Sequence, residues 1–512
     1  MKMKRFIFII FSFLIVFFFS GCDIDDNVGL NEEKDINNFV INSEQELIKY
    51  NGEASIIDIP EGVKVIKNGA FDDTIVFSIS LPSTVVDIEN EVFKDAYYLT
   101  EIYNYSELGI EIGSERNGGI AKRAKVIHTS PSEKSIIRIY LNRYVIADEV
   151  EQSTLIYYYG NQKDIIMPMQ FDVIGDYAFY KNTNLNSIVF SQIITKIGDY
   201  AFAECRNLTQ IFLSESIVEI GEYAFYNDYG LTRIKLRSNL ETIGKSAFEG
   251  CYHLAEVSNL SLYLTLAIGS EDTGFVACYA KAIQNYSEEE SLVKTYGNFV
   301  VYEDNDDVEL INYLGLDTTV EIPENVTAIS EYAFRGYDIY SIIIKGNVKQ
   351  IHHNAFKYNY HLVEVFNLTG NDLSEYFPYA VNIFDNTRES SKLFVSNDYV
   401  YYLTAEKRTL IKLIMEGSYV LIDNVDDIFE NAFLNNETDS ILLSTNIKQI
   451  DLSCFANSNI ESIYYMGSMD DLVSKPFGNE MLSSTLFRLY VYSEEPGLNN
   501  WHYEFNQVVI WS

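Results

Sequence analysis

Cysteine, proline, histidine and tryptophan are scarce in this chain of 512 residues, with counts of 5, 8, 6 and 2. So few cysteines argue against a small fold held together by disulfide bonds. Basic side chains are also in the minority, 37 against 74 acidic ones. Because the phosphate backbone of nucleic acid is bound by clustered Lys and Arg, this balance predicts that nucleic acid is not a partner.

The chain has one long apolar run, from Phe6 to Phe19, which follows Lys2, Lys4 and Arg5. This order is typical of an export signal, and the run is shorter than the roughly 20 apolar residues of a membrane-spanning helix. It leads into Phe19-Ser20-Gly21-Cys22, which resembles a bacterial lipobox except that Phe replaces the usual Leu. The resemblance implies a lipid-anchored, exported protein of the cell membrane or outer surface, attached through Cys22. A plain signal peptide containing a cysteine is the alternative.

A repeat organises the rest of the chain. The hexapeptide Ile197-Gly198-Asp199-Tyr200-Ala201-Phe202 recurs with small changes, so that phenylalanines stand 23 residues apart at four positions. Three degenerate pairs have a spacing of 22 residues. The ten repeats carry Phe71, Phe93, Phe179, Phe202, Phe225, Phe248, Phe334, Phe356, Phe433 and Phe455.

Between these phenylalanines lies a second pattern, Leu-x-x-Ile-x-Leu, as in Leu208 to Leu213. Its last three residues alternate as a half-buried strand does. Gly, Asn or Pro interrupts each repeat before an amphipathic helix could reach ten residues. One unit cannot bury its apolar side alone, whereas stacked units can align Leu over Leu and Phe over Phe. The pattern therefore predicts a solenoid of stacked coils.

The complete pattern from Ile197 to Leu213 resembles the BspA-like subclass of leucine-rich repeats, and the resemblance extends from about Ile56 to Tyr465. It implies a mainly β fold, a leucine-rich-repeat solenoid of 22–23-residue BspA-type coils interrupted by β-rich inserts, with a C-terminal β cap. It also implies a bacterial surface protein with a role in adhesion.

Three related inserts interrupt the repeats, beginning near Asn104, Asn259 and Asn367, and we interpret them as antiparallel β excursions. The resulting organisation is a signal peptide at 1–21, an acidic flexible tether at 22–45, repeat blocks at 46–103, 171–259, 324–367 and 425–465, inserts at 104–170, 260–323 and 368–424, and the cap at 466–512.

Few residues suggest a disulfide bond or a metal-binding site. Cys205 and Cys251 share a phase two coils apart, about 10 Å at the usual strand spacing, which is too far for a disulfide bond, so we expect buried core thiols. His352 and His353 lie in a repeat loop, and three or four converging ligands are what zinc needs, so we predict no metal and no cofactor. The acidic segment 303–307 lacks the glycine and distal glutamate of a calcium loop and is predicted to be a hairpin tip.

The outward positions of the strands form the predicted ligand face. It comprises Thr209, Gln210, Phe212, Thr232, Arg233, Lys235 and Glu256. Solenoid sheets often bind extended partners, and an exposed aromatic beside Arg and Lys is typical of binding hot spots. The leading hypothesis is a surface protein that binds an extracellular protein or glycan.

Two other hypotheses stay open. One is a structural cell-envelope protein that self-associates through its inserts, with an oligomeric state that the sequence leaves undetermined. The other is a hydrolase with its active site in an insert, which we place behind the binding hypotheses because we find no nucleophile, P-loop or zinc-binding motif.

Overall fold

The computed structural model describes residues 38–510 apart from 286–289, 386–389, 397, 406, 418, 495–496, 498 and 505–506. The regular secondary structure of the described residues is mainly strands, β1 to β41, joined by turns, with two short α-helices and a few 3-10 turns. The chain divides into two compact units. The first comprises 1–181, 191–203 and 216–224, and the second comprises 182–190, 204–215 and 225–512. Cys22 and the predicted signal peptide lie outside the described residues.

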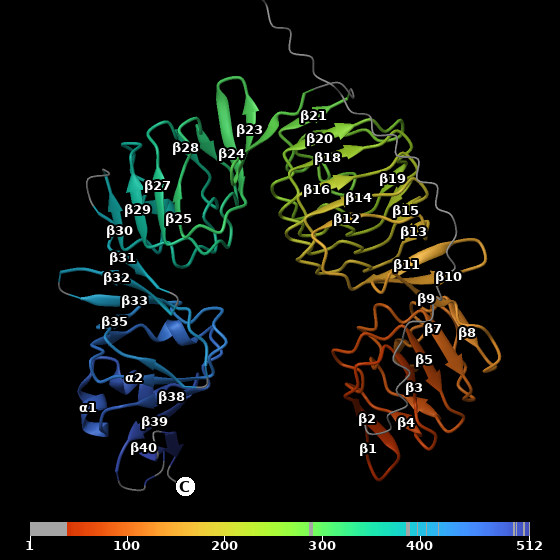
Figure 1. Cartoon of the computed structure of the whole chain (residues 1–512), viewed down its shortest axis with the longest axis horizontal. Helices are drawn as coiled ribbons and strands as arrows, with labels where there is room; N and C mark the ends of the chain where they lie inside the picture. Colours follow the sequence, from red (N-terminus) through yellow and green to blue (C-terminus); the bar gives the residue numbers. More distant parts are fainter. Residues whose placement is uncertain are drawn as a thin grey trace, which may run out of the picture. The chain divides into compact units, whose positions relative to one another are not determined.

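Each coil contributes two strands to the solenoid, as the first repeats illustrate (Figure 1). The Leu-x-x-Ile-x-Leu segments form β3 (Ile56–Asp58), β5 (Ser78–Leu81) and β7 (Glu101–Asn104), which pair in parallel with Ile57, Ile79 and Ile102 in register. The residues before the repeat phenylalanines Phe71 and Phe93 form the two-residue strands β4 (Val65–Ile66) and β6 (Asp87–Ile88), also parallel. The alternating pattern thus turns every second residue into the core.

The repeat phenylalanines stack on one another, as the sequence predicts. Ring centroids lie 4.8 Å apart for Phe179 and Phe202 in the first unit, and 5.1 Å apart for Phe225 and Phe248 in the second. The phenylalanines of the degenerate repeats also stack, with 5.1 Å between the ring centroids of Phe334 and Phe356. These rings are buried and lie nearly parallel, so identical residues one coil apart form the apolar core.

The inserts differ from the prediction in how they begin. The first strand of each insert pairs in parallel with the preceding repeat strand, so each insert starts with one more coil of the solenoid. These strands are β8 (Val126–His128) on β7, β21 (Ala282–Gln284) on β20 (Glu256–Asn259), and β30 (Asn382–Phe384) on β29 (Glu364–Asn367). The sequence missed these coils because they do not carry the repeat hexapeptide; in the first two, Gly118 O and Gly274 O accept hydrogen bonds from the backbone amides of Phe93 and Phe248.

A three-stranded antiparallel sheet follows in each insert, as predicted. The strands are β9 (Ile137–Tyr140), β10 (Tyr144–Asp148) and β11 (Ser153–Tyr158); β22 (Val293–Tyr296), β23 (Phe299–Asp304) and β24 (Asp307–Tyr313); and β31 (Leu393–Val395), β32 (Tyr399–Leu403) and β33 (Arg408–Leu413). The last strand of each sheet pairs in parallel with the next repeat strand: β11 with β13 (Val173–Ile174), β24 with β26 (Ala328–Ile329) and β33 with β35 (Asp427–Ile428). The solenoid therefore resumes directly from each insert.

The N-terminal end corrects part of the predicted flexible tether. Phe39, Val40 and Ile41 form β1 (Phe39–Ile41), which pairs antiparallel with β2 (Glu46–Tyr50). Strand β2 in turn pairs in parallel with β4, as the last strand of each insert does with its repeat. This hairpin covers the first coil because Phe39 packs on Tyr50, with ring centroids 4.9 Å apart. Residues 22–37 of the predicted tether lie outside the described part of the chain.

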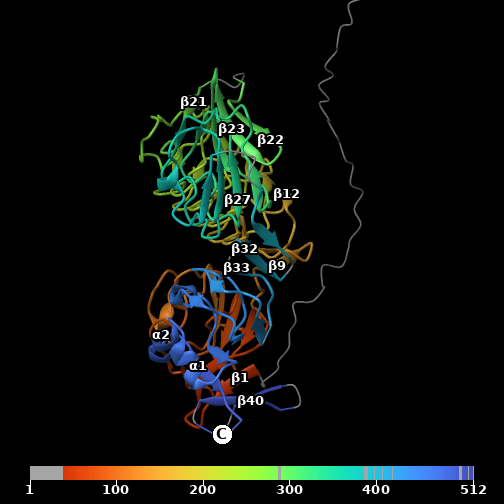
Figure 2. The same ribbon diagram turned by 90° about the vertical axis from the view of Figure 1, so that its left-hand side faces the viewer.

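The C-terminal end is not only β structure. Two helices, α1 (Met469–Ser474) and α2 (Gly478–Ser483), precede β39 (Arg488–Tyr492), β40 (Asn500–Glu504) and β41 (Gln507–Ile510) (Figure 2). Strand β39 extends the last parallel sheet by pairing with β38 (Ser462–Tyr465). Trp501 is buried, and its indole Nε1 donates to Tyr465 O at 3.0 Å. Ser468 begins α1 by accepting a hydrogen bond from Asp471 N.

Candidate functional site

The predicted ligand face lies on the parallel strands of the second unit. It spans β16 (Gln210–Phe212), β18 (Arg233–Leu236) and β20, whose central residues Ile211, Ile234 and Val257 are buried. The residues on either side of each central residue point the opposite way because side chains alternate along a strand. Between these strands lies a shallow pocket of about 200 Å³, and its lining includes Gln210, Phe212, Arg233, Lys235 and Glu256. The structure therefore brings five of the seven predicted residues to one depression.

Two of the pocket's basic side chains have no acidic partner. Within the described part of the chain, no carboxylate oxygen lies within 4.0 Å of the charged nitrogens of Arg233 or Lys235. A third cation, Arg237, lies 3.4 Å from Glu215 and donates its Nε to Leu213 O at 2.9 Å. In a chain with a formal net charge of −37, unpaired cations side by side favour an acidic group on a bound partner.

An apolar surface lies beside these cations. Phe212 is 44% exposed and Val189 is 37% exposed. The two residues are in register on β16 and the neighbouring parallel strand β14 (Ser187–Val189). Phe212 therefore offers an accessible ring next to Arg233, the combination found at the centres of binding sites.

Two predicted face residues are buried and cannot contact a partner. Thr232 is 7% exposed and Glu256 is 3% exposed. The Glu256 carboxylate accepts hydrogen bonds from Leu292 N at 2.6 Å and from Ser291 Oγ at 3.1 Å, which holds the start of the antiparallel sheet against β20. Thr209 is half-buried, and its hydroxyl donates to Asn186 O at 3.2 Å.

The same anchor occurs in all three inserts. Glu101 and Glu364, also buried, accept from Ile136 N and Lys392 N at 2.9 Å each. A sequence signal for this role exists, because Glu-x-x-Asn precedes every insert, at 101–104, 256–259 and 364–367. The fourth residue of that motif also binds its insert; Asn259 Nδ2 donates to Leu264 O at 3.0 Å. Glu256 therefore lines the pocket as a structural residue, and its buried carboxylate is held by the insert and is not available to a ligand.

The short basic cluster Lys122-Arg123-Ala124-Lys125, in the first insert, is neutralised within the protein. Lys122 pairs with Glu115 at 2.8 Å, and Lys125 pairs with Glu149. The Arg123 guanidinium lies over the rings of Tyr97 and Tyr177, at 5.2 and 5.1 Å from their centroids. Because these cations already interact with carboxylates and aromatic rings of the protein, the cluster is a poor binding site for a nucleic-acid backbone.

Two single histidines have structural roles that the sequence did not reveal. His253 is buried, and its Nε2 contacts Tyr332 O at 3.0 Å, 79 residues along the chain. His361 is also buried and contacts Asn431 O at 3.0 Å through Nε2. Each histidine thus joins one repeat block of the second unit to the next. Burial lowers the pKa of His253, which keeps the imidazole neutral in this position.

The acidic segment 303–307 is a hairpin tip, as predicted. It connects β23 to β24, with Asp304 opposite Asp307 and Asn305 in a left-handed conformation. Glu303 accepts from Tyr296 OH at 2.6 Å and pairs with Lys294 at 2.9 Å, so its carboxylate has ordinary side-chain partners.

These features define a β-solenoid of leucine-rich-repeat type with a solvent-accessible, basic and aromatic face. Six copies of the BspA type leucine rich repeat region match residues 19–115, 152–266, 316–397 and 417–485, which is well over half of the sequence. The chain belongs to this family. The family consists of bacterial cell-surface proteins, and membership favours repeat-mediated binding over catalysis.

Solved structures of similar proteins come from several bacteria. A leucine rich cell surface protein from Faecalibacterium prausnitzii is 16% identical over 85% of this chain and 94% of its own, with a TM-score of 0.23. A leucine-rich repeat protein from Bacteroides ovatus is 19% identical over 67% of this chain and 93% of its own, also with a TM-score of 0.23. At these scores the family assignment rests on the repeat sequences alone.

A comparison with curated proteins found no significant match. Among the helices that the structure describes, none has the length and apolar character needed to cross a membrane.

Proposed function

We propose that the protein is a lipid-anchored binding protein of the bacterial cell surface, which uses the face of β16, β18 and β20 to bind an extracellular protein or glycan. The observation that carries this proposal is the pocket where Phe212, Arg233 and Lys235 meet, with no carboxylate partner for either cation among the residues that the structure describes. The family assignment supports a surface location, and the Gly21-Cys22 sequence supports the anchor.

The composition of the face indicates what a partner must provide. Two adjacent cations call for carboxylate, sulfate or phosphate groups, and Arg favours a planar, bidentate acceptor. The exposed ring of Phe212 provides apolar contact area of the kind that stacks against a flat or aliphatic surface. We therefore expect the partner to be an acidic protein segment or an acidic glycan.

The binding face is tested with the soluble body of the protein, residues 23–512, against a panel of extracellular-matrix proteins and acidic glycans. For any ligand found, we expect Phe212→Ala or Arg233→Ala to weaken binding by about tenfold or more, since hot-spot truncations cost about 2 kcal/mol or more and about 1.4 kcal/mol corresponds to tenfold. Binding should also weaken as salt is raised from about 0.05 to 0.5 M, because exposed charges are screened. Biolayer interferometry measures both effects.

Matched controls are available elsewhere on the surface. Phe394 is 52% exposed and Lys349 is exposed, and both lie far along the chain from the pocket. Phe394→Ala and Lys349→Ala should leave affinity unchanged. If they weaken binding as much as the pocket variants, the proposed face is wrong, and binding only of a second copy of the chain would favour self-association through the inserts.

The anchor has its own test. In the native bacterium, Cys22→Ser should move the protein from the membrane fraction to the soluble exported fraction and abolish incorporation of a labelled fatty acid. The physical reason is that two acyl chains bind a bilayer stably, whereas an exported chain without them has no comparable hold. Immunoblots of the two fractions measure the change, and unaltered membrane retention would rule out attachment through Cys22.

A further inference from the structure

Three metal-binding side chains come together in the third repeat block. Glu331 follows β26, and His352 and His353 follow β28 (Gln350–Ile351). Strands β26 and β28 pair in parallel with Ile329 opposite Ile351. Glu331 and His353 therefore occupy the same position in successive coils, one strand spacing or about 4.8 Å apart.

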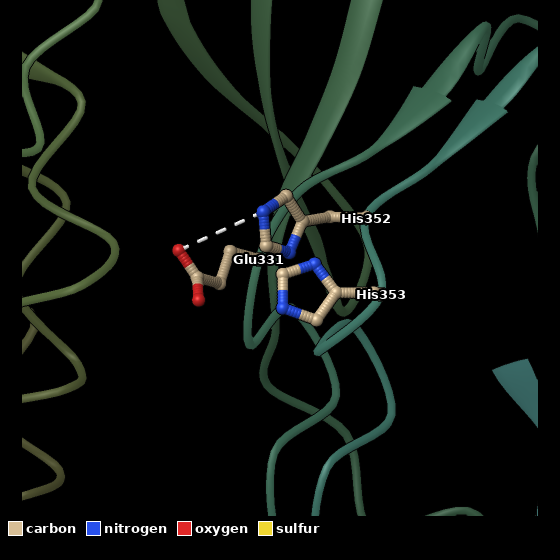
Figure 3. A group of neighbouring side chains, drawn as sticks. All are labelled: Glu331, His352 and His353. Carbon is tan, nitrogen blue, oxygen red and sulfur yellow. Dashed lines mark ion pairs between the residues drawn. The ribbon is translucent and has the colours of Figure 1, made fainter.

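The donor atoms of these side chains face one another. His352 Nε2 lies 3.9 Å from a carboxylate oxygen of Glu331, and the two imidazole rings have centroids 4.3 Å apart. One donor atom from each of the three residues lies within 4.8 Å of the other two. Figure 3 shows the Glu331 carboxylate directed toward His352, with the His353 ring beside it.

We propose that Glu331, His352 and His353 bind a divalent transition-metal ion of the zinc type. Two imidazole nitrogens and one carboxylate oxygen are a common zinc donor set, and they leave a fourth position open for water or for a group on a partner. Calcium and magnesium prefer sites made entirely of oxygen, so this donor set selects against them. The proposal reverses the sequence-based expectation that these histidines bind no metal.

A neighbouring side chain orients the carboxylate. Asn354 Nδ2 donates to Glu331 Oε1 at 2.8 Å and leaves Oε2 directed at His352. Such hydrogen bonds behind a ligand fix its position and tune its affinity. Asn354 N also lies 3.3 Å from His352 Nδ1. Nδ1 accepts this long hydrogen bond. A metal ion on Nε2 would place the ring proton on Nδ1 and break the bond, and this loss would oppose metal binding.

The site needs only small movements to close around an ion. Metal bonds of about 2.0–2.1 Å place tetrahedral ligands roughly 3.3 Å apart, so the donor atoms must approach by about an ångström. Glu331 and His352 are half-buried and His353 is exposed, which leaves their side chains free to rotate. Once bound, the ion would link two successive coils.

Zinc titration of the tag-free, chelator-treated body, residues 23–512, tests the proposal. We expect one high-affinity zinc ion per chain by calorimetry, a higher thermal unfolding midpoint with zinc, and an intense visible absorption with Co²⁺ as the probe. Glu331→Gln and His353→Gln should each weaken zinc binding by about tenfold or more, and Asn354→Ala by roughly tenfold. Binding should weaken below about pH 6, because ligating imidazoles must be unprotonated.

Glu222→Gln is the matched control, because Glu222 holds the position of Glu331 in a coil whose neighbours carry no histidine. This variant loses the same charge and should keep wild-type zinc affinity. Unfolding midpoints without metal show whether each variant is folded. Wild-type protein that binds zinc no better than His353→Gln, or binds calcium equally well, would overturn the proposal.

Discussion

Phe225→Asp is expected to lower the free energy of unfolding by at least about 4 kcal/mol. Removing a buried phenylalanine side chain alone costs about 3–5 kcal/mol, and an unpaired charge in its place adds to that cost. Phe225 is fully buried and stacks on Phe248 at 5.1 Å, so the carboxylate would lie within the stacked core. Urea denaturation followed by circular dichroism measures the change.

Phe212→Asp is the control for this experiment. It introduces the same charge 13 positions earlier in the same repeat region, at a ring that is 44% exposed. Its effect should stay within about 0.5 kcal/mol, which is usual for surface substitutions. Equal losses in the two variants would mean that the register of the core is misassigned.

Asp228→Asn is expected to stabilise the protein by about 1–3 kcal/mol at neutral and alkaline pH. Asp228 is fully buried, and neither carboxyl oxygen has a hydrogen bond of ordinary geometry within the described part of the chain, although the backbone N–H of Cys205 favours its charged form. It stands three residues after the repeat phenylalanine, where other coils carry a neutral donor. Asn359 at this position donates to Phe356 O at 3.0 Å, and Cys251 Sγ donates to Phe225 O at 3.1 Å. A neutral amide therefore suits the site better than a carboxylate, because the cost of burying the charge outweighs the help of the Cys205 N–H.

The pH dependence of this effect has a definite sign. Burial raises the pKa of the Asp228 carboxyl well above its usual value. Between the unfolded pKa, about 3.9, and the raised folded pKa, the folded state binds more protons than the unfolded state. The contribution of Asp228 to stability therefore falls as pH rises through that interval and stays low above it. The advantage of Asp228→Asn should be small near pH 4 and largest above the folded pKa.

Unfolding midpoints of both proteins from pH 4 to 9 measure this difference. Asp306→Asn, at the exposed hairpin tip, removes the same charge without burial and should shift the midpoint little at any pH. A wild-type advantage over Asp228→Asn at pH 8 would show that the buried carboxylate is stabilised by contacts that its surroundings do not suggest.

The repeat sequence was sufficient to predict the solenoid because its contacts join equal positions one coil apart. Phe179 and Phe202, or Ile57 and Ile79, meet through a spacing that is visible in the sequence. The extra coils that end in β8, β21 and β30 escaped prediction because none of them carries the repeat hexapeptide, and Gly118 and Gly274 hold the alanine position in the first two. The helices α1 and α2 have six residues each, too few for a helical periodicity to be recognised.

The candidate site was predicted less completely. The alternation of side chains along a strand correctly predicted that Gln210, Phe212 and Arg233 are exposed, because the side of the strand on which a side chain lies is a local property. The same alternation wrongly predicted that Glu256 is exposed, since the segment at Leu292 that covers this carboxylate lies 36 residues later in the chain. The contact between Glu331 and His352 was not predicted, because the histidines were considered within their own coil and the neighbouring coil supplies Glu331.

By itself, the sequence determined the phase of the coils and the residues that fill their core. Tertiary structure alone decided which outward-facing side chains are covered by an insert, which cations have an acidic partner among the described residues, and which donor atoms converge on one point. The physical reason is that core contacts in a solenoid repeat at a constant sequence interval, whereas surface contacts join segments whose separation along the chain follows no period.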